Sequence, residues 1–163
     1  MSEGIVRVKR NADALNEVAD AIEEGRNDWG FEMDRWITIP DVEESPQISE
    51  SEFYHGKRPK HNCGTSFCIA GWAVALFPRR ATSNAFRFDA NPKEEFSIER
   101  RGKHILGLSE EDADRLFYAD IETPLRAART LRILALGEPD VRTAIESANN
   151  KRSFERRVAK LAG

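Results

Sequence analysis

The chain has 163 residues, 33% of them charged and 40% apolar, which suits one domain with a solvated surface and a real core. No apolar stretch approaches the roughly 20 residues that a membrane-spanning helix needs, so the sequence excludes a helical membrane protein. The first ten residues hold no apolar signal core, and two cysteines do not make a disulfide framework. We therefore expect a cytoplasmic protein.

The net charge of −3 is distributed unevenly along the chain. Residues 1–62 carry 8 basic and 14 acidic side chains, whereas residues 125–163 carry 9 basic and 4 acidic ones. A basic segment of this kind can contact nucleic acid or an acidic protein surface. The alternative is that the acidic and basic parts of one domain attract each other within the fold.

The first predicted helix begins at Asn11, which can cap it, and ends at Gly25, with apolar residues at helical spacing between them. Large apolar side chains then follow in irregular order over residues 29–39. Aromatic residues at this density usually cover one end of a helical core, which is the interpretation we prefer. A cluster that stacks on a ligand is the functional alternative.

Residues 41–60 begin acidic, end basic and hold few apolar side chains. Loops longer than about 12–15 residues are uncommon in compact domains and are often functional. The sequence therefore predicts a surface insertion, extended or partly disordered, that can supply part of a partner contact. Its candidate partner-binding residues are Phe53, Tyr54, Lys57 and Arg58.

The stretch 61–77 (HNCGTSFCIAGWAVALF) holds both cysteines and the longest apolar run of the chain. It predicts a buried central helix over about 66–77, with Thr65 or Ser66 as N-cap and Cys68 just inside the first turn. Its small residues allow neighbouring helices to approach closely. Gly71 costs roughly 0.5–1 kcal/mol relative to alanine inside a helix, so we expect another element to pack against its Cα.

The remaining residues predict five short helices, and serine, threonine, proline and glycine mark several of their ends. These helices begin at or near Ser97, Ser109, Pro124, residue 139 and residue 151. The prediction for residues 1–163 is thus a single all-α domain. It is an irregular bundle of six or seven short helices around the buried central one, with the 41–60 loop as an insertion.

Several motifs in this chain occur together in a known group of proteins. They are residues 15–22 (LNEVADAI), Met33 with Trp36, residues 63–73 (CGTSFCIAGWA), residues 106–108 (LGL) and Leu116-Phe117. With them the chain resembles a group of small, uncharacterised proteins that are frequent in bacteriophages and prophages of actinobacteria. The resemblance covers most of the chain, although the 41–60 loop is less typical of the group. The resemblance implies that the chain comes from a phage or prophage, and it does not indicate an activity.

Metal binding is one chemistry that the central stretch could support. His61, Cys63 and Cys68 lie within eight positions, and His55 or His104 could complete a tetrahedral set of zinc ligands. The spacing is not one of the common zinc knuckles, and a buried cysteine behaves as a small hydrophobe. Two packed, reduced thiols are therefore the preferred interpretation, no cofactor is expected, and zinc is the alternative.

Covalent chemistry at the cysteines is a further alternative. Cys68 near a helix N-terminus could react as a thiolate, and the segment resembles the nucleophile region of papain-like proteases. That region is two residues shorter between its cysteines, and the one downstream histidine here, His104, has no aromatic-flanked Asn or Asp to orient it. A disulfide between Cys63 and Cys68 is also geometrically possible across a turn.

The basic C-terminal helices suggest a DNA-binding regulator as another class. Its candidate contacts are Arg152, Arg156, Arg157 and Lys160. The helices within 109–136 are short enough to imitate a helix-turn-helix, but the link between them is longer than the tight turn of that motif. The acidic net charge also weakens nonspecific binding to phosphates at physiological salt.

The sequence contains no phosphate-binding loop and none of the common hydrolase motifs. We therefore expect a non-enzymatic phage or prophage accessory protein that acts by binding a host or viral protein. The rival hypotheses are a zinc- or thiol-dependent domain centred on His61, Cys63 and Cys68, and the DNA-binding regulator.

Overall fold

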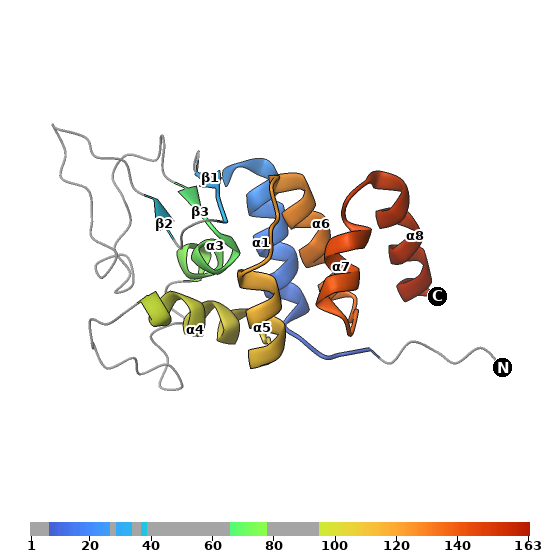
Figure 1. Ribbon diagram of the computed structural model, residues 1–163, viewed down its shortest axis with the longest axis horizontal. Helices are drawn as coiled ribbons and strands as arrows, with labels where there is room; N and C mark the ends of the chain where they lie inside the picture. The colour runs from blue at the N-terminus through green and yellow to red at the C-terminus, as the bar shows by residue number, and fades with distance from the viewer. Residues whose placement is uncertain (1–6, 27–28, 34–36, 39–65, 78–94) are drawn as a thin grey trace, which may run out of the picture.

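The computed structural model of the chain describes residues 7–26, 29–33, 37–38, 66–77 and 95–163 (Figure 1). Within these residues it has seven helices: α1 (Ala12–Glu24), α3 (Ile69–Leu76), α4 (Glu95–Leu106), α5 (Glu110–Phe117), α6 (Pro124–Ala135), α7 (Val141–Ser147) and α8 (Lys151–Ala162). The predicted all-α fold with several short helices is confirmed. The predicted 41–60 insertion lies outside the described residues.

The predicted N-caps of α1, α5 and α6 are present because each depends on residues close together in the sequence. Asn11, Ser109 and Thr123 each accept a hydrogen bond from a backbone N–H three residues later, at 3.1 Å. Gly107 and Gly137 follow α4 and α6 with φ of 66° and 97°, a left-handed conformation that favours glycine. Local sequence thus determines where most of these helices begin and end.

Three two-residue strands form a small sheet at one end of the molecule (Figure 1). They are β1 (Gly30–Phe31), β2 (Ile37–Thr38) and β3 (Ser66–Phe67), in the order β1-β3-β2. The central strand β3 pairs parallel with β1 and antiparallel with β2. The sequence did not predict these strands, since two residues are too few to show an alternating pattern.

The central helix α3 begins later than predicted. Its N-cap is Cys68, whose Sγ accepts a hydrogen bond from the backbone N–H of Gly71 at 3.4 Å. The prediction of Thr65 or Ser66 as N-cap is wrong, because pairing in β3 holds Ser66 in an extended conformation. Cys68 therefore precedes the first turn of α3 and does not lie inside it. Every residue from Ile69 to Ala75 is buried, as predicted.

Helix α4 packs closely against α3. A Cβ placed on Gly102 would lie only 2.9 Å from the Cβ of Ala70, so the two helices meet at a glycine and an alanine. The expectation that small residues of the central helix permit close packing is confirmed at Ala70. Gly102 in the interior of α4 costs helix stability, and the close packing of α4 on α3 offsets that cost.

A pair of tryptophans lies beside the small sheet. The rings of Trp29 and Trp72 meet edge to face, with centroids 5.7 Å apart, and Trp72 Nε1 donates a hydrogen bond to the carbonyl oxygen of Gly30 at 3.0 Å. Phe31 and Met33 pack against the same core. The predicted role of residues 29–33 as a cover for the core is confirmed, and both indoles are too deeply buried to stack on a ligand.

The remainder of the core forms where α1 and α6 lie side by side (Figure 1). Leu15 and Val18 of α1 and Leu131 and Leu134 of α6 are completely buried there. Arg132 of α6 also reaches Asp20 and Glu23 of α1, each at 2.7 Å. At this contact the acidic N-terminal part and the basic C-terminal part of the chain attract each other within the fold.

The residues just before α1 contact α5 and the end of α6 with the turn that follows it. Arg10 binds Asp112 of α5 at 3.0 Å and donates to the carbonyl oxygens of Leu134 and Glu138 at 3.2 and 2.7 Å. The backbone N–H of Val8 donates to the carbonyl oxygen of Gly137 at 2.9 Å. In the described part of the chain, no helix is long and apolar enough to cross a membrane.

Candidate functional site

Most of the residues predicted for zinc or partner binding lie outside the described residues. These are Phe53, Tyr54, His55, Lys57, Arg58, His61 and Cys63. Within the described residues, no group of three or more His, Cys, Asp or Glu side chains could hold a metal ion. The zinc site and the loop contact therefore stay predictions.

Of the residues predicted for a zinc or thiol site, the structure describes Cys68 and His104. Cys68 is 1% exposed, and its sulfur serves as the N-cap acceptor of α3. His104, by contrast, is exposed in the last turn of α4, where desolvation and the nearby cations Lys103 and Arg100 lower its pKa. A substrate could reach Cys68 only after local opening of the core, so this geometry suits a structural cysteine.

The predicted nucleic-acid contacts all lie on α8, and the structure separates them into two groups. Arg152, Arg156 and Lys160 are exposed and recur every four residues, which places them on one side of the helix. Arg157 instead forms an ion pair with Glu138, whose side chain is 1% exposed. Arg157 therefore stabilises the fold, and the exposed row of Arg152, Arg156 and Lys160 is hereafter called the basic face.

The opposite side of α8 anchors it to the rest of the domain. Leu161 is buried, Phe154 and Val158 pack against the core, and the guanidinium of Arg129 lies 5.6 Å from the centre of the Phe154 ring. The Arg7 guanidinium donates to the carbonyl oxygen of Leu161 near the end of the helix. These contacts hold the basic face in a fixed orientation toward solvent.

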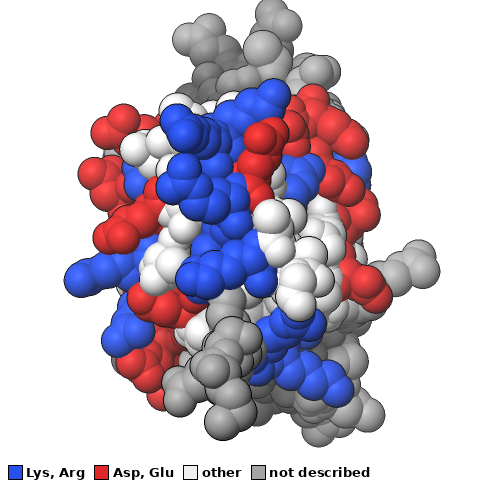
Figure 2. All heavy atoms as spheres, turned by 90° about the vertical axis from the view of Figure 1, so that its right-hand side faces the viewer, with Lys and Arg blue, Asp and Glu red and all other residues white. Residues whose placement is uncertain are grey.

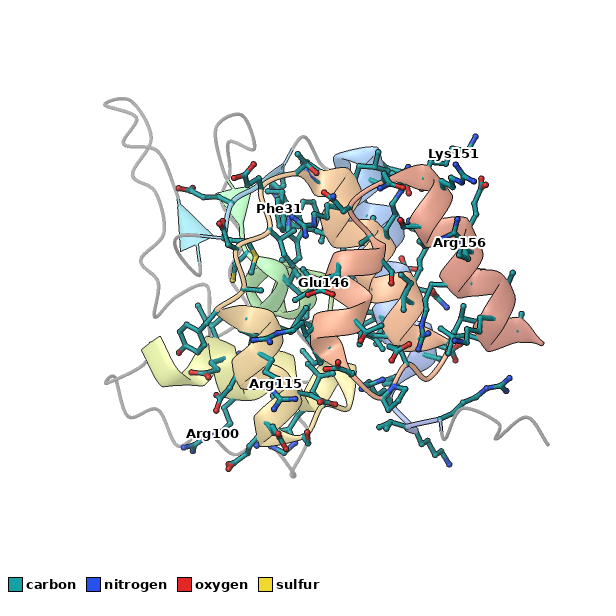
Figure 3. All side chains as sticks on the ribbon, turned by 45° about the vertical axis from the view of Figure 1, so that its right-hand side comes forward. Phe31, Arg100, Arg115, Glu146, Lys151 and Arg156 are labelled. Atoms are coloured by element: carbon teal, nitrogen blue, oxygen red, sulfur yellow. The ribbon has the colours of Figure 1, made fainter. Side chains whose placement is uncertain are left out.

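The positive charge at the basic face is confined to a narrow strip of the surface. The sequence of α8 contains five basic residues and one acidic residue. Figure 2, which views the molecule from the α8 side, shows lysine and arginine side chains in a column across this face, with acidic side chains on both sides of it. Figure 3 shows Lys151 and Arg156 on α8 itself. The positive surface is thus about one helix wide.

The chain matches no model of a known protein family, no curated protein and no solved structure. The functional proposal below is therefore built on the geometry of the basic face and on the resemblance to phage proteins noted in the sequence.

Proposed function

We propose that this chain is a non-enzymatic binding protein that recognises an acidic segment of another protein through the basic face of α8. We place it, on the sequence resemblance, in the cytoplasm of a bacterium that carries a phage or prophage. The observation that carries the proposal is the row of three exposed cations on a helix whose other side is anchored by Leu161 and by the Arg157–Glu138 pair.

The width of the basic face favours a protein partner over duplex DNA. Arg152 and Lys160 are eight residues apart, which corresponds to about 12 Å along the helix. Duplex DNA presents about one negative charge per 1.7 Å of its axis when both strands are counted, so about seven phosphates lie along that length, against three cations on the protein. The acidic side chains on both sides of the column (Figure 2) would repel the rest of a duplex. A partner segment with a few carboxylates matches this pattern better.

The charges of the basic face contribute only part of the affinity. Exposed ion pairs contribute about 0.2–1 kcal/mol each, so three of them supply roughly 1–3 kcal/mol. Charge complementarity also accelerates association and selects among partners. We therefore expect apolar contacts next to the charged row to contribute as well, and binding to weaken as salt is raised.

The test is affinity capture from host and phage-infected extracts with two charge-reversed variants beside the wild type. The first carries Arg152→Glu, Arg156→Glu and Lys160→Glu. The control carries Lys9→Glu and Arg100→Glu, charge reversals at exposed cations on other elements. We expect a captured protein that the first variant loses and the control keeps. Equal capture by both, or capture of nucleic acid alone, would refute the proposal.

A further inference from the structure

A cleft of about 610 Å³ lies between α5 and α7, on different helices from the basic face. Its walls include Asp114 and Tyr118 from the end of α5, Asp120 from the turn that follows, and Ile145 and Glu146 from α7. Figure 3 shows Arg115 on α5 and Glu146 on α7, the two helices on either side of the cleft. Its volume is within the range of sites that hold small organic ligands or single side chains.

Tyr118 forms a wall of this cleft and of a smaller one of about 360 Å³ beside it. Its side chain is a large exposed aromatic surface, 64% accessible, which is uncommon for a ring of this size. The hydroxyl donates a hydrogen bond to Oε2 of Glu99 in α4 at 3.0 Å, which favours one orientation of the ring. Desolvation and the Glu99 carboxylate raise the pKa of Tyr118 to about 12, and the ring therefore stays neutral.

Three carboxylates from different elements face the same space. Within the described residues, the side chains of Asp114, Asp120 and Glu146 form neither a hydrogen bond nor an ion pair, and they do not group closely enough to hold a metal ion. Asp140 also lines the cleft, but it is engaged as the N-cap of α7. The lining thus offers separate carboxylate acceptors to a cationic ligand that has several donors.

Two cationic side chains, Arg115 and Arg142, also line the cleft and would repel a positively charged ligand. Arg115 pairs with Glu111 at 2.7 Å, on its own helix. Arg142 has no such carboxylate among the described residues. With four carboxylates against two guanidiniums, the lining keeps a negative excess.

We propose that this cleft binds the guanidinium group of an arginine side chain in a peptide. The planar guanidinium can stack on the exposed face of Tyr118 while its N–H groups donate to Asp120 and Glu146. Ile145 offers an apolar contact for the aliphatic part of the side chain. This site is independent of the proposed basic-face function, because it uses other helices and the opposite charge.

The first test is an NMR titration of the full chain with capped arginine amide at low salt, followed through the backbone amides of Asp120, Ile145 and Glu146. We expect saturable shifts at these amides. Capped citrulline amide has the same shape without the charge and should give none, whereas a capped Gly-Gly-Arg-Gly-Gly peptide should bind at least as well as the single residue. Equal shifts with citrulline, or no saturable shift with either arginine probe, would overturn the proposal.

The second test uses variants whose folding is checked by the dispersion of the same spectra. Asp120→Asn with Glu146→Gln should weaken arginine binding about tenfold, and Tyr118→Leu about threefold. Tyr118→Phe should retain binding, because it keeps the ring. Arg142→Gln should strengthen binding, because it removes an opposing cation. Arginine affinity that is unchanged in the first two folded variants would contradict the proposal.

Discussion

The Arg157 guanidinium pairs with the Glu138 carboxylate, which is 1% exposed, and this pair fixes α8 to the turn between α6 and α7. Glu138 is further engaged through its other oxygen, which accepts a hydrogen bond from the backbone N–H of Asp140 at 3.2 Å. The pair therefore couples the position of the basic face to the capping of α7.

Removing the cation of this pair should destabilise the fold. Arg157→Met leaves a buried carboxylate without its partner, a change that costs about 3–5 kcal/mol in fully buried pairs. Because the Arg157 side chain is 18% exposed, we expect about 2–3 kcal/mol here. The free energy of unfolding in urea measures it. The double variant Arg157→Met, Glu138→Leu should be less destabilised than the sum of the two single changes; additive losses would contradict a direct pair.

Gly102→Ala should also destabilise the protein, although alanine has a higher helix propensity than glycine. Alanine gains up to about 1 kcal/mol over glycine in a helix interior, but overpacking a tight contact costs about 1–3 kcal/mol. The new Cβ would lie 2.9 Å from the Ala70 Cβ and 3.0 Å from its Cα, which the backbone of α3 cannot easily relieve. We expect a net loss of about 1–2 kcal/mol in urea unfolding. Ala70→Gly in the same chain should recover part of the loss; a stabilised Gly102→Ala variant would show that α3 and α4 are farther apart.

The buried position of Cys68 predicts slow thiol chemistry. In a Cys63→Ser variant, the remaining thiol should react with a disulfide reagent only at the rate of local or global opening, because it is 1% exposed. The same reaction in denaturant provides the control for full access. Rapid reaction of the native variant would favour the nucleophile hypothesis. Zinc at one ion per wild-type chain, lost in this variant, would favour the zinc site.

The N-cap residue of α7, Asp140, should make the free energy of unfolding change with pH in the acidic range. A hydrogen bond from the Thr143 hydroxyl, 2.8 Å away, is the main reason that the pKa of Asp140 lies below its ordinary value. Since the unfolded chain then binds a proton more readily than the folded one, the cap contributes fully above the ordinary aspartate pKa of about 3.9. The contribution is lost as pH falls through the lower pKa of the folded state.

Asp140→Asn provides the comparison for this pH effect. Asparagine is also a good N-cap but has no proton to bind, so the variant should show a smaller fall in urea midpoint between about pH 5 and pH 2.5 than the wild type. Identical pH dependence in the two proteins would show that Asp140 is not shifted by the cap.

Structural features that depend on neighbouring residues in the sequence could be predicted, whereas features that depend on contacts between distant residues could not. The caps at Asn11, Ser109 and Thr123 were predicted because their partners lie three residues away. Cys68 as N-cap could not be predicted, because the extended conformation before it depends on pairing between β3 and β1, whose partner residues are 36 positions apart in the chain. The role of Gly102 was missed for the same reason, although a glycine inside a helical pattern was a signal for it.

The candidate surface was predicted in part. The charge asymmetry of the sequence indicated the C-terminal helices, and the structure then showed that Arg152, Arg156 and Lys160 are exposed on one side of α8. Arg157 was assigned to the same surface because its buried partner, Glu138, lies 19 residues away and has no local signal. The cleft beside Tyr118 was not predicted, because it forms only where α5 and α7 meet.

The affinity of the purified partner for the charge-reversed proteins tests the central claim most directly. The claim is that the basic face of α8 binds an acidic protein segment, and the measurement is the dissociation constant at low and at physiological salt. Reversal of Arg152, Arg156 and Lys160 should weaken binding by about a hundredfold at low salt, whereas the control reversal of Lys9 and Arg100 should change it by less than about threefold. Equal affinities for the two variants, or displacement of the partner by an equal concentration of duplex DNA, would contradict the account.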